Sequence, residues 1–181
     1  MLRWLLRRRI AAFGRTFDYD VTYMQEMLDT DPEAARRYGR LSALSRYRSG
    51  IPAAPWHAAH LRAALSEDCG PCAQLSITMA ERAGVPAPVL RAAFTGDFAA
   101  LSPDVALACR FADAILRRDP ETDTLRAQVL AQWGRRGLLS LSLSVLAART
   151  FPAVKFALGH AQSCSRVVVD GAPVVRLRHA A

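Results

Sequence analysis

Cys69 and Cys72 are the residues of this sequence whose type and spacing best suit chemistry. Residues three apart in a helical turn lie on one face, so their sulfur atoms can come close enough to form a disulfide. If Ser66 or Asp68 is the N-cap, the pair lies in the first turn of a helix, where unpaired backbone N–H groups stabilise a thiolate. The pattern predicts a reversible dithiol–disulfide pair, with two buried structural thiols as the alternative.

A zinc site is a second interpretation of the same residues. His57-x-x-His60 and Cys69-x-x-Cys72 together supply four side chains of the kinds that bind tetrahedral zinc. The two pairs are expected on different helices, and their spacing does not require them to meet. We therefore expect no metal, and we expect each histidine, taken singly, to be a surface or core residue.

The longer segment 66–75, which reads SEDCGPCAQL, resembles the CxxC-containing branch of the carboxymuconolactone decarboxylase and alkyl hydroperoxidase D-like superfamily. The resemblance continues through residues 79–85 and, more loosely, through 151–155 and 158–160. It implies an all-α helical bundle that assembles into homo-oligomers through its helices. It also implies a cysteine pair that reduces peroxides or transfers dithiol equivalents, without an organic cofactor or a metal.

The proton relay of that family is not carried over. Redox members have a histidine four residues after the second cysteine, where this sequence has Ser76. They also have a glutamate about three helical turns before the first cysteine, where this sequence has His57 and His60. Glu67 is the nearest carboxylate that could replace the relay, and a histidine suits proton transfer at neutral pH. We therefore expect the two cysteines, Glu67 and His57 to form the catalytic set.

Two classes of function follow from these residues. The first is a thiol-dependent peroxidase or disulfide oxidoreductase, which needs a peroxide or disulfide substrate and a reducing protein or small dithiol. The second is a non-catalytic helical homo-oligomer whose CxxC is vestigial or senses redox state, docked to a partner or a membrane through its N-terminal helix. Decarboxylation is not expected, because the decarboxylase branch lacks the cysteine pair.

The elements that must position the cysteines are expected to be helices. Start signals that combine a capping side chain, a proline and an acid occur three times, at Asp31-Pro32-Glu33, Ser102-Pro103-Asp104 and Asp119-Pro120-Glu121. We expect helices over about residues 32–47, 54–65 and 69–84, with others starting near 103 and 120. The sequence divides into an N-terminal helical arm with lead-in helices (1–49), a core (50–165) and a tail (166–181).

Two segments bear on the fold class. Residues 139–144 alternate leucine and serine, as a strand would, but the run continues through residues 145–149, is long and contains no turn residue. We interpret it as a buried helix whose serines let neighbouring helices approach closely. A true strand signal comes later, where Val167-Val168-Val169, Asp170-Gly171 and Val174-Val175 predict a hairpin. The predicted fold is all-α with a small C-terminal β-hairpin.

The net charge of +8 does not indicate a nucleic-acid-binding domain. Much of it belongs to the N-terminus, where residues 1–15 carry no acid but hold the arginines Arg3, Arg7, Arg8, Arg9 and Arg15. A domain that binds nucleic acid would distribute a basic patch over its fold. No run approaches the roughly 18 consecutive apolar residues of a membrane-spanning helix.

Residues 1–15 predict a short basic amphipathic helix. Its apolar positions share one face, namely Leu2, Leu5, Leu6, Ile10 and Phe13. Arginines interrupt the apolar stretch, unlike a secretory signal, so we expect a cytoplasmic protein. We favour a helix that packs on the body or on a neighbouring subunit. The alternative is peripheral contact with an anionic membrane, with Trp4 at the interface.

Overall fold

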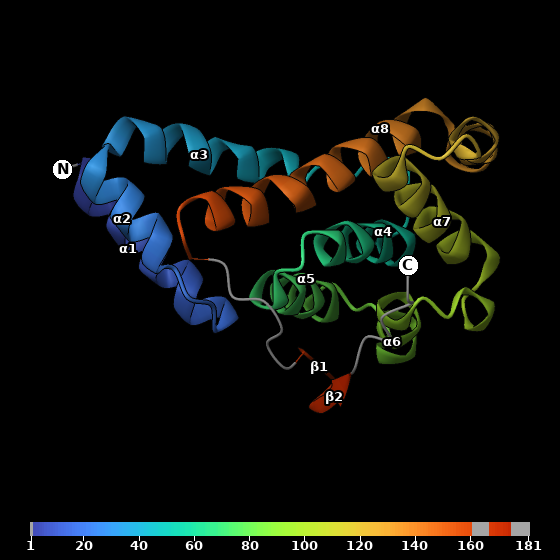
Figure 1. Cartoon of the computed structure of the whole chain (residues 1–181), viewed down its shortest axis with the longest axis horizontal. Helices are drawn as coiled ribbons and strands as arrows, with labels where there is room; N and C mark the ends of the chain where they lie inside the picture. Colours follow the sequence, from blue (N-terminus) through green and yellow to red (C-terminus); the bar gives the residue numbers. More distant parts are fainter. Residues whose placement is uncertain (1, 161–166, 175–181) are drawn as a thin grey trace.

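The computed structural model of this chain describes residues 2–160 and 167–174. Its helices are α1 (Leu2–Phe17), α2 (Thr22–Thr30), α3 (Pro32–Leu44), α4 (Ala53–Ser66), α5 (Gly70–Arg82), α6 (Ala87–Thr95), the 3-10 helix η1 (Phe98–Ala100), α7 (Pro103–Arg117) and α8 (Thr122–Ala157). The strands β1 (Val167–Val169) and β2 (Ala172–Val174) follow. The predicted all-α fold with a small C-terminal hairpin is therefore confirmed (Figure 1).

Helix α4 is the centre of the bundle and packs against α5, α6, α7 and α8. Figure 1 shows α3, α8, α4 and α5 as successive layers, with α7 at the opposite end from α1 and α2. Alanines at four buried positions of α4 carry little side-chain bulk, so neighbouring helices can approach its backbone; these are Ala58, Ala59, Ala63 and Ala64. The fold thereby ties the segment before the cysteine pair into its most buried element.

Two of the three predicted start signals act through local hydrogen bonds. The Asp31 carboxylate accepts from the backbone N–H of Glu33 at 2.8 Å, and α3 starts at Pro32. Asp119 accepts from the N–H of Glu121 at 2.9 Å just before α8. Helix α3 ends at Leu44, earlier than predicted, and α6 lies in a segment for which no helix was predicted.

The predicted caps of the cysteine helix are wrong. Helix α4 extends through Ser66, whose hydroxyl donates to the carbonyl of Ala63 at 2.7 Å. Asp68 has a φ of 48°, a left-handed conformation that turns the chain between the two helices. An N-cap needs extended backbone, and Cys69, at φ −105° and ψ 94°, supplies it. The first cysteine is therefore itself the N-cap of α5.

The leucine–serine segment is helical, as predicted, and forms part of α8. Buried Ser140 donates to the carbonyl of Ser49 at 2.8 Å and accepts from the N–H of Ser49 at 2.9 Å. The serines thus anchor a loop as well as allowing close packing. Gly134, at φ 65°, bends α8 in a conformation that favours glycine.

Helix α8 is the one helix in the described part of the chain that is long and apolar enough, by length and composition, to cross a membrane. Nearly half of its most apolar stretch is buried inside the molecule. It packs against α3, α4 and α7. Because the core helix of a folded bundle meets the same criterion, this result alone does not indicate a membrane span.

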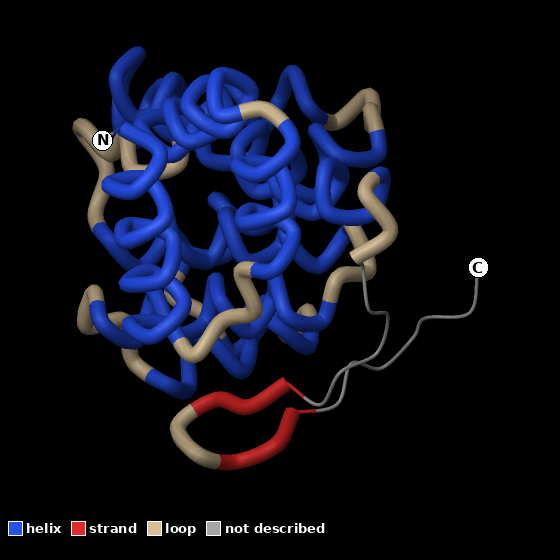
Figure 2. The backbone as a smooth tube through the Cα atoms, turned by 90° about the vertical axis from the view of Figure 1, so that its left-hand side faces the viewer, coloured by secondary structure: helices blue, strands red, loops and turns tan. Residues whose placement is uncertain are grey.

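The hairpin lies against one side of the helices (Figure 2). Strand β1 pairs antiparallel with β2, with Val167 opposite Val174, and Val175 lies outside the described residues. The side chain of Gln74 in α5 accepts from the N–H of Val168 at 2.7 Å and donates to its carbonyl at 3.1 Å. This amide pairs with the edge of β1 as a further strand would, and so attaches the hairpin to the cysteine helix.

The N-terminal helix α1 packs against α2 and α5. Arg3 and Arg7 both form ion pairs with Asp29 of α2. The interpretation of this segment as a helix is right, but its buried apolar face is narrower than predicted, because Leu5 is exposed. Within this structure, α1 covers the body of the protein.

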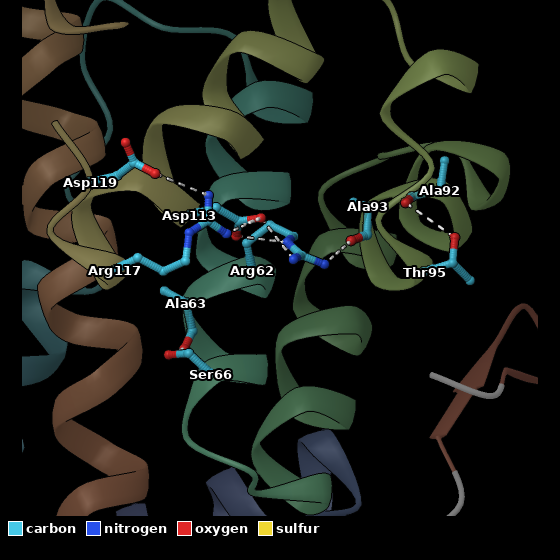
Figure 3. Close-up of polar contacts among 9 residues, drawn as sticks. All are labelled: Arg62, Ala63, Ser66, Ala92, Ala93, Thr95, Asp113, Arg117 and Asp119. Atoms are coloured by element: carbon cyan, nitrogen blue, oxygen red, sulfur yellow. Dashed lines mark hydrogen bonds and ion pairs between the residues drawn. The ribbon is translucent and has the colours of Figure 1, made fainter. Parts of the chain in front are cut away.

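A buried ion pair joins helices α4, α6 and α7 (Figure 3). The Arg62 guanidinium donates to both carboxylate oxygens of Asp113 in α7, at 2.9 and 2.8 Å. It also donates to the carbonyl of Ala93 in α6 at 3.1 Å. Such bidentate geometry is the strong form of an arginine–carboxylate contact, and here it fixes α4, α6 and α7 together.

Candidate functional site

The two cysteines form a disulfide at the start of α5. Their Cα atoms lie 5.2 Å apart, with Cys69 as the N-cap and Cys72 in the first turn. Pro71 fits between them, because a first helical turn leaves its N–H groups unpaired and proline has none to lose. The predicted pairing of these residues is therefore present in the fold.

The disulfide is covered by the connection between α1 and α2. Cys69 and Cys72 are only 3% and 6% exposed. The hydroxyl of Tyr19, in that connection, lies 3.8 Å from the Sγ atom of Cys72. Figure 1 shows α1 and α2 at the end of the molecule where α5 begins. The N-terminal arm is thus part of the site and not a separate appendage.

Contacts from α5 and α1 hold Tyr19 in place. The Arg82 guanidinium donates to the carbonyl of Thr16 and lies 4.7 Å from the centre of the Phe17 ring. The backbone N–H of Tyr19 donates to the carbonyl of Gly14 at 3.0 Å. These contacts fix the end of α1 and direct the phenol toward the sulfur atoms.

A buried lysine from α8 completes this environment. The Nζ atom of Lys155 lies 4.8 Å from the centre of the Tyr19 ring and 5.6 Å from that of Tyr23. Lys155 is 1% exposed, and no carboxylate of the described residues lies within ion-pair distance of it. Burial lowers the pKa of Lys155, while the nearby charge of Asp20 opposes that shift.

The tyrosines around Lys155 are neutral at physiological pH. Burial raises the pKa of Tyr19 to about 12, so its hydroxyl keeps its proton. Burial also raises the pKa of Tyr23, whose hydroxyl lies 3.2 Å from that of Tyr38 in α3. The ring of Tyr38 meets Phe151 of α8 edge-on at 5.4 Å. An aromatic cluster thus connects the cysteine site to α3 and α8.

Glu67 forms an ion pair with Arg149 of α8. Its Oε1 atom accepts from Nε of Arg149 in α8 at 2.6 Å, and the side chain is largely buried. Glu67 is close to the cysteines in sequence, but its carboxylate contacts the guanidinium of Arg149 and not a sulfur atom. Its role as a proton relay stays a prediction.

His57 lies toward the opposite end of α4 from the cysteines, and His60 lies near the middle of that helix. At 1.5 Å per residue, the stretch from His57 to the end of α4 spans about 14 Å. The Nδ1 atom of His60 lies 3.1 Å from Oγ of Ser144, and its ring stacks on Trp56 at 5.5 Å. Burial lowers the pKa of both histidines to about 4, so both are neutral at pH 7. The structure does not bring them to the disulfide.

The zinc interpretation finds no support in this arrangement, since its two thiol ligands are bonded to each other. Among the described residues, no group of three or more histidine, cysteine or acidic side chains could hold a metal ion. The hydroxyl of Ser76 donates to the carbonyl of Cys72 at 2.9 Å and not to a sulfur. Cys109 is buried in α7 as a free thiol, and Cys164 lies outside the described residues.

No family model, curated protein or solved structure matches this chain. The resemblance to the alkyl hydroperoxidase D-like superfamily therefore rests on the motif residues alone.

Sequence reasoning did not identify Tyr19 and Lys155 as site residues. Tyr19 had no local signal, because its contact with Cys72 spans 53 positions. Lys155 did have one: it is the only lysine in a sequence with 24 lysines and arginines. It also lies in one of the segments that carry the loose resemblance, which could have marked it as a candidate.

Proposed function

We propose that this protein is a thiol-dependent oxidoreductase whose Cys69–Cys72 pair is oxidised and reduced in turn. The observation that supports the proposal is the disulfide at the first turn of α5. Free N–H groups at a helix N-terminus favour a thiolate, and a thiolate is the reactive form of cysteine. The resemblance to the CxxC-containing peroxidase family agrees with this proposal.

The proposed cycle balances with a peroxide as the oxidant. A thiolate of the reduced pair attacks one peroxide oxygen, the O–O bond breaks, and the other oxygen leaves as an alcohol after taking a proton. The resulting sulfenic acid reacts with the second cysteine, which forms the disulfide and releases water. A small dithiol or a reducing protein then returns two electrons through a mixed disulfide.

Thiol counting and peroxide consumption test the proposal. Mild oxidation of the reduced protein should remove two thiols without forming a covalent dimer. Cys69→Ser and Cys72→Ser should each abolish peroxide consumption. Cys109→Ala is the matched control, because Cys109 is a buried free thiol outside the pair. If both cysteines of the pair stay reduced, or if neither variant changes consumption, the proposal is refuted.

We propose in addition that the chain forms a homo-oligomer through α8. Leu139 and Leu146 are each about half exposed and, seven residues apart, lie on one side of the helix, with Leu143 partly exposed between them. The resemblance also implies assembly through helices. This face would serve a non-catalytic oligomer with a redox-sensing CxxC equally well, so the cysteine variants above decide between the two functions.

For the N-terminal helix we propose packing, supported by the ion pairs of Arg3 and Arg7 with Asp29. A membrane contact would instead use the exposed Trp4 and Leu5. Sedimentation with phosphatidylserine vesicles distinguishes packing from membrane contact. If α1 packs on the protein, the protein should stay in the supernatant. Binding that Trp4→Ala abolishes would show the membrane contact.

A further inference from the structure

The cysteine pair has a polar partner that none of the sequence motifs indicated. Within the described residues, Tyr19 is the one whose side-chain polar atom lies at hydrogen-bond distance from a sulfur of the pair, at 3.8 Å from Sγ of Cys72. Ser76, at the position of the family's histidine, donates instead to a backbone carbonyl. The proposed redox cycle therefore has a phenol where a relay histidine is missing.

We propose that Tyr19 is a catalytic residue of this pair, whose hydroxyl donates to Sγ of Cys72 and makes Cys72 the thiolate of the reduced form, with Lys155 as a positioning residue behind the ring. This inference rests on the proposed function. A hydrogen bond to a neutral sulfur is weak, whereas one to a thiolate is charge-assisted. The contact therefore strengthens when the disulfide is reduced, and this difference favours the reduced state.

The protonation state of Tyr19 agrees with this role. Burial keeps the phenol neutral at physiological pH, so it is a donor and does not bring a second negative charge to the site. The start of α5 contributes in the same direction, because Cys72 lies in the first turn, where N–H groups are unpaired.

Lys155 acts through Tyr19. Its ammonium lies against the face of the ring, 4.8 Å from the centre, and is almost completely buried. A cation on the face of the ring strengthens the phenol as a donor and adds positive potential near Tyr19. Asp20 opposes part of this charge, but its carboxylate is held by the N–H and hydroxyl of Thr22. Tyr23, the other ring beside Lys155, is neutral.

The assignment gives each sulfur a role in reduction by a small dithiol. One thiolate of the reductant attacks Sγ of Cys69, the Cys69–Cys72 bond breaks, and its electron pair goes to Sγ of Cys72. The departing thiolate is stabilised by the Tyr19 hydroxyl, and thiol–disulfide exchange is faster when the leaving thiolate is more stable. The second thiol of the reductant then attacks its own sulfur in the mixed disulfide and releases Cys69 as a thiol.

The pH dependence of alkylation of the reduced, full-length protein tests this assignment. Iodoacetamide labelling is followed separately at Cys72 and Cys69 by mass spectrometry, and the midpoint of each profile is read, since a midpoint is insensitive to changed access. Tyr19→Phe keeps the ring and removes the hydroxyl. We expect it to raise the Cys72 midpoint by about one pH unit, a tenfold loss of thiolate at neutral pH. Lys155→Met should shift it in the same direction.

Tyr38→Phe is the matched control, because its hydroxyl contacts Tyr23 and not a sulfur. It should leave the Cys72 midpoint unchanged. An unchanged midpoint in a folded Tyr19→Phe variant overturns the proposal, and so does a shift confined to Cys69. The measurement needs no turnover, so it separates two failures. A shifted Cys72 midpoint in a protein that consumes no peroxide and reduces no disulfide would confirm the contact and refute the proposed function.

Discussion

Removing the carboxylate of Asp113 should strongly destabilise the bundle. In Asp113→Ala, the Arg62 guanidinium loses both of its charged contacts but stays enclosed, since the two side chains are only 14% and 10% exposed. Breaking one partner out of a buried pair costs about 3–5 kcal/mol, because the remaining charge is left uncompensated. The carbonyl of Ala93 still accepts one N–H of Arg62, so we expect the lower end, about 3 kcal/mol.

Urea denaturation and thermal melting measure this loss. For a chain of this length, about 3 kcal/mol corresponds to a fall of roughly 6–12 °C in the melting temperature. Asp123→Ala is the matched control: Asp123 also pairs with an arginine, at 2.5 Å, but is 84% exposed, so its removal should have almost no effect. The double variant Arg62→Met/Asp113→Leu should recover most of the stability, because it leaves no charge buried.

Equal losses in Asp113→Ala and Asp123→Ala would refute the reasoning. They would show that Arg62 reaches water once its partner is removed. The cysteine site gives an independent check, because none of the contacts of this ion pair involves Tyr19, Lys155 or the two cysteines. The alkylation midpoint of Cys72 should therefore be the same in folded Asp113→Ala as in the unmodified protein.

Three further outcomes are expected. The free energy of unfolding should fall as the pH drops from about 6.5 to about 4, because burial depresses the pKa of His57 and His60 in the folded protein. In this range the unfolded chain binds protons at these histidines and the folded protein does not. Urea denaturation of His60→Gln should show a smaller loss over the same range. Leu146→Glu should convert an oligomer into a monomer in sedimentation, whereas an unchanged mass would exclude this face. If Glu67 carries the proton, Glu67→Gln should slow peroxide consumption by about 10²–10⁴-fold, and a full rate would remove it from the relay.

The features that the sequence predicted correctly depend on neighbouring residues. Asp31 and Asp119 act on N–H groups two positions away, so the start signals of α3 and α8 can be recognised without knowing the fold. The hairpin turn at Asp170 and Gly171 is equally local, since both residues adopt the left-handed conformation that the dipeptide favours. The cysteine pair belongs to this class, because its spacing alone allows the disulfide.

The features that the sequence missed depend on packing. Helices α2 and α6 have nine residues each, and isolated helices of that length are marginal in water. Tertiary contacts must therefore stabilise them, and such contacts leave weak signals in a local pattern. The cap of α5 was misassigned for a related reason: α4 continues through Ser66, which removes that side chain from the start of the next helix.

Proximity in sequence was a poor guide to the site. His57 and Glu67 were selected because they precede Cys69, yet α4 carries the histidine away along its axis and Arg149 binds the glutamate. The groups that do reach the site come from the α1–α2 connection and from the last turn of α8. A helical bundle brings together the ends of distant helices, so the neighbours of a residue at a helix terminus are seldom its neighbours in the chain.

The choice of lysine at position 155 has a physical explanation. Nearly every other basic residue of the chain is an arginine. A guanidinium carries five N–H donors in a rigid plane, and each needs an acceptor when it is buried. Lys155 lies against the faces of Tyr19 and Tyr23, which attract a cation but offer few lone pairs. A compact ammonium suits such a site. The only lysine of the sequence is thus the residue that packs on the ring of Tyr19, next to the cysteine pair.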